Sequence, residues 1–365
     1  MPLHSAPRAT RRRFIAGAGV FAGVALVSYP RAPARALPRL RVGTYGGYLQ
    51  DSFNRHVFPA FEAATGLRVD SVAQPTGEAW VAQLEAAAEN GTAPADVSMV
   101  SNNALLRGEQ SSLWAELDLA KLPNYRYLEP HFVHRDPDGR VDGVGAVSWY
   151  TTLVTNTDVY PDPPDSWAEL WRPRNRDAIG LVARPQKGFL LEITAVTFFD
   201  GTKILAAKEG IDEVLAKITE LKPNVKLWYR DEGRFQQALQ SGEVPMGQYY
   251  HDIAGLAAAE GFPVRSTFPR EGGVLDSASW AVSRSAKLAE EAHVFIDYMC
   301  SPAVQAEMAR KLLTAPTVVR AYTDISAEEF AAVGSELPPI IPEYAIYEKW
   351  GDWLAERWTE TIIGE

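Results

Sequence analysis

Residues 40–45 have the sequence LRVGTY, and residues 67–69 have the sequence LRV. Both are short runs rich in apolar residues, which favour strands. Between them, Val57, Phe58 and Phe61 recur at helical spacing. This part of the chain therefore predicts a strand, a helix and a second strand, in that order.

The same alternation continues along the chain. Trp80, Leu84 and Ala88 lie four residues apart and favour a helix with one apolar side, and DVSMV at residues 96–100 favours the next strand. A repeated β-α-β order is typical of mostly parallel sheets with helices on both faces. We therefore predict an α/β fold.

The N-terminus has the features of an export signal. Arginines at residues 11–13 precede an apolar stretch to about Val27, which is too short to span a membrane, and a small-x-small site follows at residues 34–36. We expect residues 1–36 to be a twin-arginine-type signal peptide, cleaved after Ala36, and the soluble mature protein to lie in the periplasm. The alternative is an uncleaved, basic and amphipathic N-terminus.

The charge and the cysteine content limit the partners and the disulfides that the chain can have. Removing residues 1–36 takes away six arginines and no acid, which moves the formal charge from −10 to −16. A chain with that charge is a poor partner for nucleic acid. The single cysteine, Cys300, cannot form an internal disulfide and lies in an apolar helical run, so we expect a buried structural thiol.

Several local patterns, taken in order, resemble the periplasmic solute-binding proteins of ABC importers, and most of all the spermidine and putrescine type. The matching stretches are VGTYGGY at 42–48, FPAFEAATG at 58–66, PADV at 94–97, SWYTTLVTN at 148–156, PDSWAELW at 164–171, GEVPMG at 242–247, PREGG at 269–273 and AHVFIDYM at 292–299.

The resemblance implies a two-lobed α/β fold of the type II periplasmic-binding-protein kind, with a ligand cleft between the lobes and two hinge crossings. Residues 37–146 would form lobe 1, residues 147–272 lobe 2, and residues 273–365 would return to lobe 1 with C-terminal helices. It also implies a monomer without a cofactor, which delivers a small solute to a membrane permease and its ATPase.

In open α/β sheets, ligands bind beyond the carboxyl ends of the strands. That rule and the expected crossings select the candidate ligand-binding residues, which are mostly aromatic or polar. They are Tyr45, Tyr48, Ser101, Asn102, Trp149, Tyr150, Thr151, Arg184, Trp228, Tyr250, Asp252 and Asp276.

The chain departs from the resemblance at residues 183–189, ARPQKGF. Polyamine binders of this kind carry acidic residues there, whereas this chain has Arg184 and Lys187. Arginine suits the capture of a carboxylate or phosphate, so an acidic or zwitterionic solute becomes a candidate beside a polyamine, and Asp252 or Asp276 could still bind an amine. The alternative is that Arg184 is an ordinary solvated surface residue.

Two other classes of function are open. Adjacent tyrosines late in the second lobe hold iron in related ferric-ion-binding proteins, so Tyr249 and Tyr250 could bind iron, with Arg184 holding a synergistic anion and His251 or Asp252 completing the metal site.

An enzyme is the other alternative. The sequence has no Gly-x-Ser-x-Gly, Walker, His-Glu-x-x-His or Cys-x-x-Cys motif, and Asp231 and Glu232 are better explained by helix capping. We therefore expect no catalytic residues.

Overall fold

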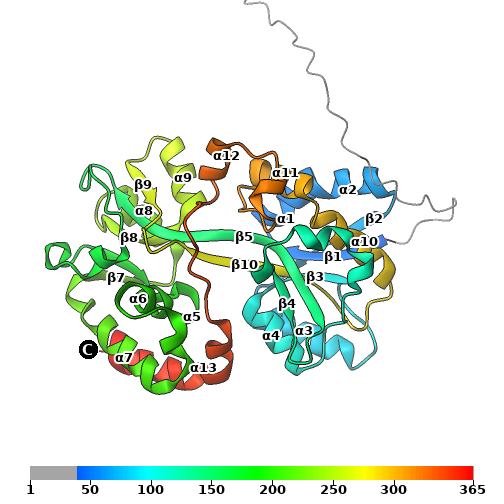
Figure 1. Ribbon diagram of the computed structural model, residues 1–365, viewed down its shortest axis with the longest axis horizontal. Coiled ribbons are helices and arrows are strands. Elements are labelled where there is room, and N and C mark those ends of the chain that lie inside the picture. The colour runs from blue at the N-terminus through cyan, green and yellow to red at the C-terminus, as the bar shows by residue number, and fades with distance from the viewer. Residues whose placement is uncertain (1–38, 365) are drawn as a thin grey trace, which may run out of the picture.

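A ten-stranded sheet runs through both lobes of the computed structural model, which describes residues 39–364 (Figure 1). Its strands are β1 (Arg39–Tyr45), β2 (Arg68–Gln74), β3 (Val97–Ser101), β4 (Val133–Arg135), β5 (Val141–Asn156), β6 (Ile179–Val182), β7 (Val225–Tyr229), β8 (Met246–Tyr250), β9 (Val264–Thr267) and β10 (Val274–Val282). The order is β2-β1-β3-β10-β5-β8-β6-β7, and β4 and β9 also pair with β5.

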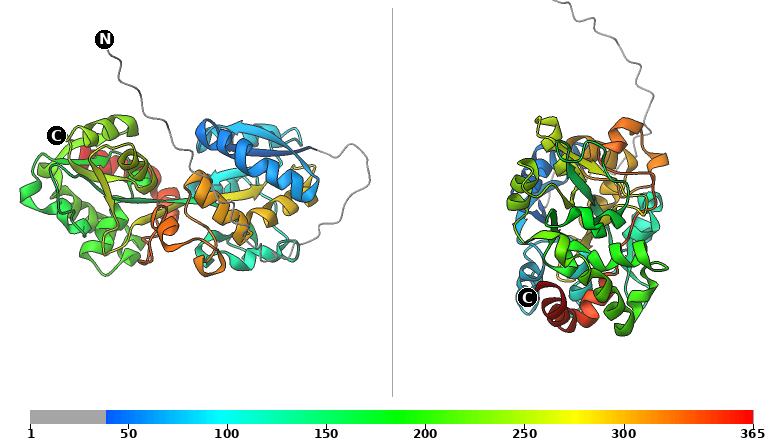
Figure 2. Two further views of the ribbon diagram at one scale, coloured as in Figure 1. Left: turned by 90° about the horizontal axis from the view of Figure 1, so that it is seen from above. Right: turned by 90° about the vertical axis from the view of Figure 1, so that its left-hand side faces the viewer.

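Helices cover the sheet in both lobes (Figures 1 and 2). They are α1 (Tyr48–Ser52), α2 (Phe58–Thr65), α3 (Glu78–Ala88), α4 (Asn102–Gln110), α5 (Pro185–Gly188), α6 (Leu190–Phe198), α7 (Lys208–Thr219), α8 (Glu232–Gln240), α9 (His251–Ala259), α10 (Ala289–Met299), α11 (Pro302–Leu312), α12 (Ala327–Ala331) and α13 (Tyr344–Trp358). Strand β1 pairs in parallel with β2 and β3, and β6 pairs in parallel with β7 and β8. The α/β fold predicted from the sequence is confirmed.

Strands β5 and β10 connect the two lobes (Figure 2). The first half of the 16-residue strand β5 pairs with β4, and its second half pairs with β8 and β9. Strand β10 pairs antiparallel with β5 in the middle and with β3 in lobe 1. Both crossings are therefore strands of one sheet.

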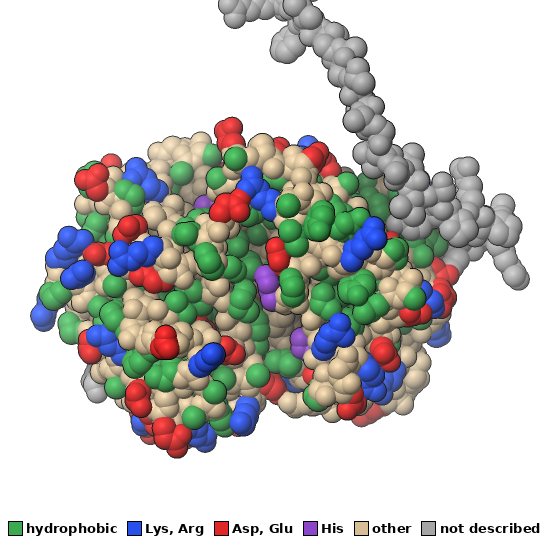
Figure 3. Space-filling view, viewed as in Figure 1, with side chains coloured by type: hydrophobic (Ala, Val, Ile, Leu, Met, Phe, Trp, Pro, Cys, Tyr) green, Lys and Arg blue, Asp and Glu red, His purple; other side chains and the backbone are tan. Residues whose placement is uncertain are grey.

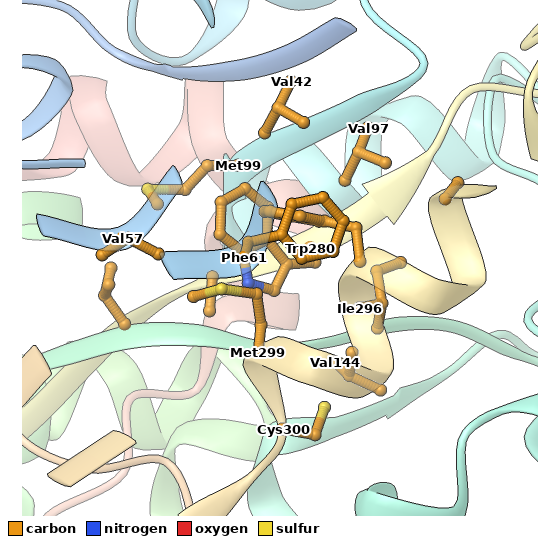
Figure 4. Close-up of a cluster of buried hydrophobic side chains, with 14 of the residues drawn as sticks. Val42, Val57, Phe61, Val97, Met99, Val144, Trp280, Ile296, Met299 and Cys300 are labelled. Carbon is orange, nitrogen blue, oxygen red and sulfur yellow. The ribbon is translucent and has the colours of Figure 1, made fainter. Parts of the chain in front are cut away.

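Each lobe has its own hydrophobic core. In lobe 1, Trp280 makes edge contacts with Phe53 and Phe295, at ring-centroid distances of 5.9 and 5.0 Å, and the buried Cys300 belongs to the same cluster (Figure 4). Burial raises the pKa of the Cys300 thiol well above its usual range. In lobe 2, Trp167 and Leu153 lie at full burial in a separate cluster.

The C-terminal helix α13 differs from the sequence-based expectation for residues 273–365. Helices α10 and α11 contribute to the core of lobe 1, whereas the apolar face of α13 is buried in the core of lobe 2. The chain reaches lobe 2 again through a third, irregular crossing that lies beside β10, where Ile340 bonds to the backbones of Gly273 and Leu275. Apolar residues at helical spacing, such as Leu354 and Trp358, complete the core of lobe 2 and hold the helix there.

The predicted signal peptide, residues 1–36, lies outside the described residues. Among residues 39–364, no helix has the length and apolar character needed to cross a bilayer. On the face shown in Figure 3, acidic and basic side chains are interspersed over both lobes.

The docking of α13 on lobe 2 can be tested with Trp358→Ala. Trp358 is 2% exposed, donates its Nε1 hydrogen to the Ala183 carbonyl at 3.0 Å and contacts Trp228 edge-on. We expect the substitution to lower the free energy of unfolding by about 3–5 kcal/mol in urea titrations, because a large buried ring is lost. The control is Phe262→Ala, since Phe262 is 42% exposed. Equal losses in both variants would contradict the placement of α13.

Candidate functional site

Two connected pockets lie along the junction of the lobes. The first, of about 120 Å³, is in lobe 2 and is lined by Thr151, Val182, Arg184, Lys187, Tyr229, Arg230, Glu232, Tyr249 and Tyr250. The second, of about 440 Å³, takes its lining from both lobes, and includes Tyr48, Val147, Trp149 and Thr314 from one side and Glu232, Tyr250 and Asp252 from the other. Because they share Glu232, Tyr249 and Tyr250, we treat them as one cleft.

Strand alternation decides which residues of the first crossing face this cleft. Trp149 and Thr151 line it, whereas Tyr150 lies on the opposite face of β5 with Leu275, where its ring contacts Phe268 at 5.1 Å. Successive side chains of a strand point to opposite faces, so three consecutive residues cannot all face one ligand. Tyr150 is therefore not brought together with the other candidates.

The second crossing places Asp276 beside Trp149, its partner in the β5–β10 register. Its Oδ1 accepts hydrogen bonds from the Tyr344 hydroxyl at 2.7 Å and from the Ser277 backbone N–H at 2.8 Å. No described residue donates a hydrogen bond to Oδ2. Burial raises the pKa of Asp276, while these two bonds and the positive charge of Lys187 act against that rise. The carboxylate thus keeps one oxygen available.

Three residues predicted from strand ends lie near Asp276, which was predicted from the second crossing. The pKa of Tyr45 is raised by burial and by the charge of Asp276, and its hydroxyl bonds to Ser101. The side-chain amide of Asn102 donates to both the backbone and the hydroxyl oxygen of Ser277 at 3.1 Å. The structure therefore places Tyr45, Ser101, Asn102 and Asp276 close together.

A basic group of three residues lies in the lobe 2 pocket. Arg184, Lys187 and Arg230 line it, and all three are exposed to solvent. Within residues 39–364, none of them forms an ion pair with a carboxylate, although arginines elsewhere do so at short range. These cations are free to bind an anionic group of a ligand.

Trp228 lies away from the pocket, and its neighbour Tyr229 takes the place expected for it. Trp228 contacts Trp358 of α13 at a ring distance of 6.1 Å, whereas Tyr229 lines the pocket and donates its hydroxyl to the Gln248 carbonyl. The two side chains lie on opposite sides because successive side chains of β7 point to opposite faces of the sheet.

The second pocket also contains polar groups that lack partners. Tyr48 is 67% exposed at its edge. Asp252 Oδ1 and Thr314 Oγ1 are buried and have no hydrogen-bond partner among the described residues. Burial raises the pKa of Asp252 to about 6. Unpaired buried polar atoms are uncommon, and at a cleft they indicate contacts that a ligand can make.

The tyrosine pair does not have the arrangement of an iron site. The hydroxyl of Tyr250 donates to the Glu232 carboxylate at 2.9 Å, and that of Tyr249 is bonded to the Gln236 side chain at 3.2 Å. Burial, together with nearby Glu232, raises the pKa of both phenols well above the usual range, which disfavours the tyrosinates that bind ferric iron.

Sequence reasoning missed the contribution of α13. Tyr344, at the first turn of α13, donates to Asp276, and nothing in its local sequence marks it as a cleft residue. Its position is fixed by Glu192 of α6, which is fully buried and accepts hydrogen bonds from the Glu343 backbone at 3.0 Å and from the Tyr347 hydroxyl at 2.7 Å. Burial raises the pKa of Glu192 to about 7.

Comparisons with known proteins show the family to which the chain belongs. Residues 57–332 match the family model described as bacterial extracellular solute-binding protein. The match covers most of the chain, so the protein belongs to that family.

The known relatives include two that are named for different solutes. The spermidine/putrescine-binding periplasmic protein 1 of Haemophilus influenzae is 27% identical over 74% of this chain and 72% of its own length. The gamma-aminobutyric acid-binding protein of Pseudomonas aeruginosa is 26% identical over 78% of this chain and 77% of its own length.

A solved ABC transporter substrate-binding protein from Bradyrhizobium japonicum has a TM-score of 0.72 and 22% identity, and the alignment covers 89% of this chain and 99% of that chain. The family match confirms the predicted class, a bacterial extracellular solute-binding protein, and the solved structure confirms the periplasmic-binding-protein fold. They give the ferric-ion alternative no support.

The buried Glu192 predicts a measurable pH dependence of stability. Its pKa is about 7 in the folded protein against an ordinary value of 4.5. Between these values the folded state keeps a proton that the unfolded chain has lost, so the free energy of unfolding falls as the pH rises. This group should account for a fall of about 2–3 kcal/mol from about pH 5 to about pH 8.

The test is urea unfolding of wild type and Glu192→Gln at both pH values. The amide does not titrate, so the variant should lack that part of the fall, whereas Glu209→Gln, at an exposed site, should behave as wild type. A variant with the full wild-type fall would show that Glu192 is not the group responsible.

Proposed function

We propose that the cleft captures a small zwitterionic solute, with its amino group at Asp276 and its acidic group at Arg184, Lys187 and Arg230. The observation that carries the proposal is the nearness of opposite charges: the positive charge of Lys187, which lines the lobe 2 pocket, acts on the buried Asp276 carboxylate. Asp276 presents an oxygen that no described residue bonds, and the lobe 2 pocket presents three cations without ion-pair partners. A ligand with both charges satisfies both ends.

A polyamine fits this cleft less well. Its second ammonium group would lie beside Arg184 and Lys187, where charges of the same sign repel each other. The relative from Pseudomonas aeruginosa named for gamma-aminobutyric acid supports the zwitterion, since that compound carries one amine and one carboxylate.

Capture would work through the hinge. Asp276 lies on a crossing strand, Tyr45 and Ser101 belong to lobe 1, and Arg184 and Arg230 belong to lobe 2. A solute that contacts both lobes binds the closed arrangement more tightly than the open one and shifts the equilibrium toward closure. The closed form is then the one that a permease recognises.

The finer expectations belong to the same proposal. We expect export by the twin-arginine pathway and cleavage after Ala36, because of the arginines at residues 11–13 and the small-x-small site. We expect the mature protein to act as a monomer and to release its solute unchanged to the permease and ATPase.

Three ligands with four-carbon chains separate the possible charge patterns. They are gamma-aminobutyric acid with one charge of each sign, putrescine with two ammonium groups, and succinate with two carboxylates. In calorimetric titrations we expect the zwitterion to bind at least 10-fold more tightly than either of the others, and zwitterions of two to six carbons would then define the chain length. Tighter binding of putrescine would overturn the zwitterion and favour a polyamine.

Arg184→Ala tests the anionic end of the ligand. We expect affinity for the best zwitterion to fall by roughly 30-fold or more, which is about 2 kcal/mol, because the acidic group loses a bidentate partner. The matched control is Arg55→Ala, an exposed arginine of lobe 1, with circular dichroism to confirm folding. Unchanged affinity in Arg184→Ala would remove this residue from the site.

A further inference from the structure

We propose that lobe 1 holds a second site, separate from the cleft, that binds a divalent transition-metal ion through Glu109, His134 and Asp142. One ligand atom from each residue lies within 4.8 Å of the others, and none of the three side chains is exposed. A set of two carboxylates and one imidazole suits borderline ions such as Zn²⁺, Mn²⁺, Co²⁺ and Ni²⁺. The inference does not depend on the proposed solute.

The three ligand atoms converge on one point. His134 Nδ1 lies 2.8 Å from Asp142 Oδ1 and 3.0 Å from Glu109 Oε1. Separations near 3 Å are close to those of adjacent ligands around an ion with bonds of about 2.1 Å. The side chains thus need only small movements to surround a cation.

Hydrogen bonding within the cluster leaves one atom unsatisfied. A ring nitrogen carries at most one hydrogen, and the hydrogen bond of His134 Nδ1 is with Asp142. Glu109 Oε1 is fully buried and has no hydrogen-bond partner among the described residues. A buried carboxylate oxygen without a donor is costly, and a cation bound at this point would satisfy it.

The electrostatics of the cluster favour a cation. Asp136 and Asp142 line the same pocket as Glu109, so acidic groups are crowded together at this point. Arg140, which lines the same pocket, is already paired with Asp136 and Asp138 at 2.7 and 2.9 Å. A divalent ion would therefore supply charge that this arginine does not.

The fold fixes the donors independently of the hinge. Glu109 lies in the last turn of α4, His134 on β4 and Asp142 at the start of β5, and β4 and β5 are paired antiparallel in lobe 1. Glu109 and Asp142 line a pocket of about 490 Å³ that is also lined by Asp136 and Asp138. This space leaves room for water to complete the coordination of an ion.

The test is calorimetric titration of the full chain with ZnCl₂ and with MnCl₂, after removal of metal by dialysis against EDTA. We expect one equivalent to bind, and the affinity to fall roughly 10-fold or more in His134→Ala and in the isosteric variants Glu109→Gln and Asp142→Asn. His131→Ala and Asp138→Asn are controls, since they remove a nearby imidazole and a nearby carboxylate outside the cluster. Both should bind as wild type does.

Two outcomes would overturn the site. One is the absence of binding by wild type at millimolar metal, and the other is equal weakening in the control and cluster variants, which would indicate nonspecific association with surface acids. Melting temperatures give a second measurement, since an ion that binds only the folded state should raise the wild-type value, and this rise should be lost in Glu109→Gln. Glu109→Gln keeps the side-chain shape, so its own melting curve also reports whether it folds.

Discussion

The antiparallel pairing of β5 with β10 is the constraint on which the rest of the structure depends. These strands lie side by side at the centre of the sheet and carry the chain between lobes in opposite directions. Their register sets Trp149 beside Asp276 and Tyr150 beside Leu275. Because paired residues share a face, one pair is available to the cleft and the other closes the opposite side of the hinge. The same two strands, β5 and β10, therefore contribute to both the site and the hinge.

The charges of the cleft follow from how each lobe contributes to it. The crossing strand provides Asp276 at a depth where burial raises the carboxylate pKa, and the lobe 2 pocket provides its basic side chains at the surface. Opposite charges held on different parts of the protein do not neutralise each other in advance. A solute that bridges them gains from both, whereas a solute of one sign is repelled at one end. Selectivity in such a cleft depends on unfavourable contacts as much as on favourable ones.

Much of the fold was predictable from local patterns, because apolar spacing reports which elements form and in what order. The rule on the carboxyl ends of strands also selected Tyr45, Ser101 and Asn102, and the structure places all three near Asp276, since neighbouring strand ends share one edge. The face of the strand on which each side chain lies was not predictable. Tyr150 lies opposite the cleft, because one residue along a strand reverses the side chain.

Long-range packing was also invisible in the sequence. The apolar stripe of α13 predicts that one face of the helix is buried, but it does not predict which lobe covers that face. The structure shows that Trp358 contacts Trp228 and the Ala183 carbonyl of lobe 2. For the same reason Trp228 faces α13 and not the pocket. The cluster of Glu109, His134 and Asp142 joins three elements with no metal-binding spacing along the chain, so a motif search passes over it.

The third crossing gives the hydrogen bond between Tyr344 and Asp276 a role beyond packing. Without that donor, and without the Ser277 N–H, a buried carboxylate in the empty cleft would lack partners and its proton affinity would rise. Both donors bond to Oδ1, so the ionised form is supported while Oδ2 stays available to a ligand. Tyr344 is in turn held by a helix whose first turn is bonded to Glu192 deep in lobe 2. The carboxylate on the crossing strand is thus supported partly from lobe 2, and this links ligand recognition to the relative position of the lobes.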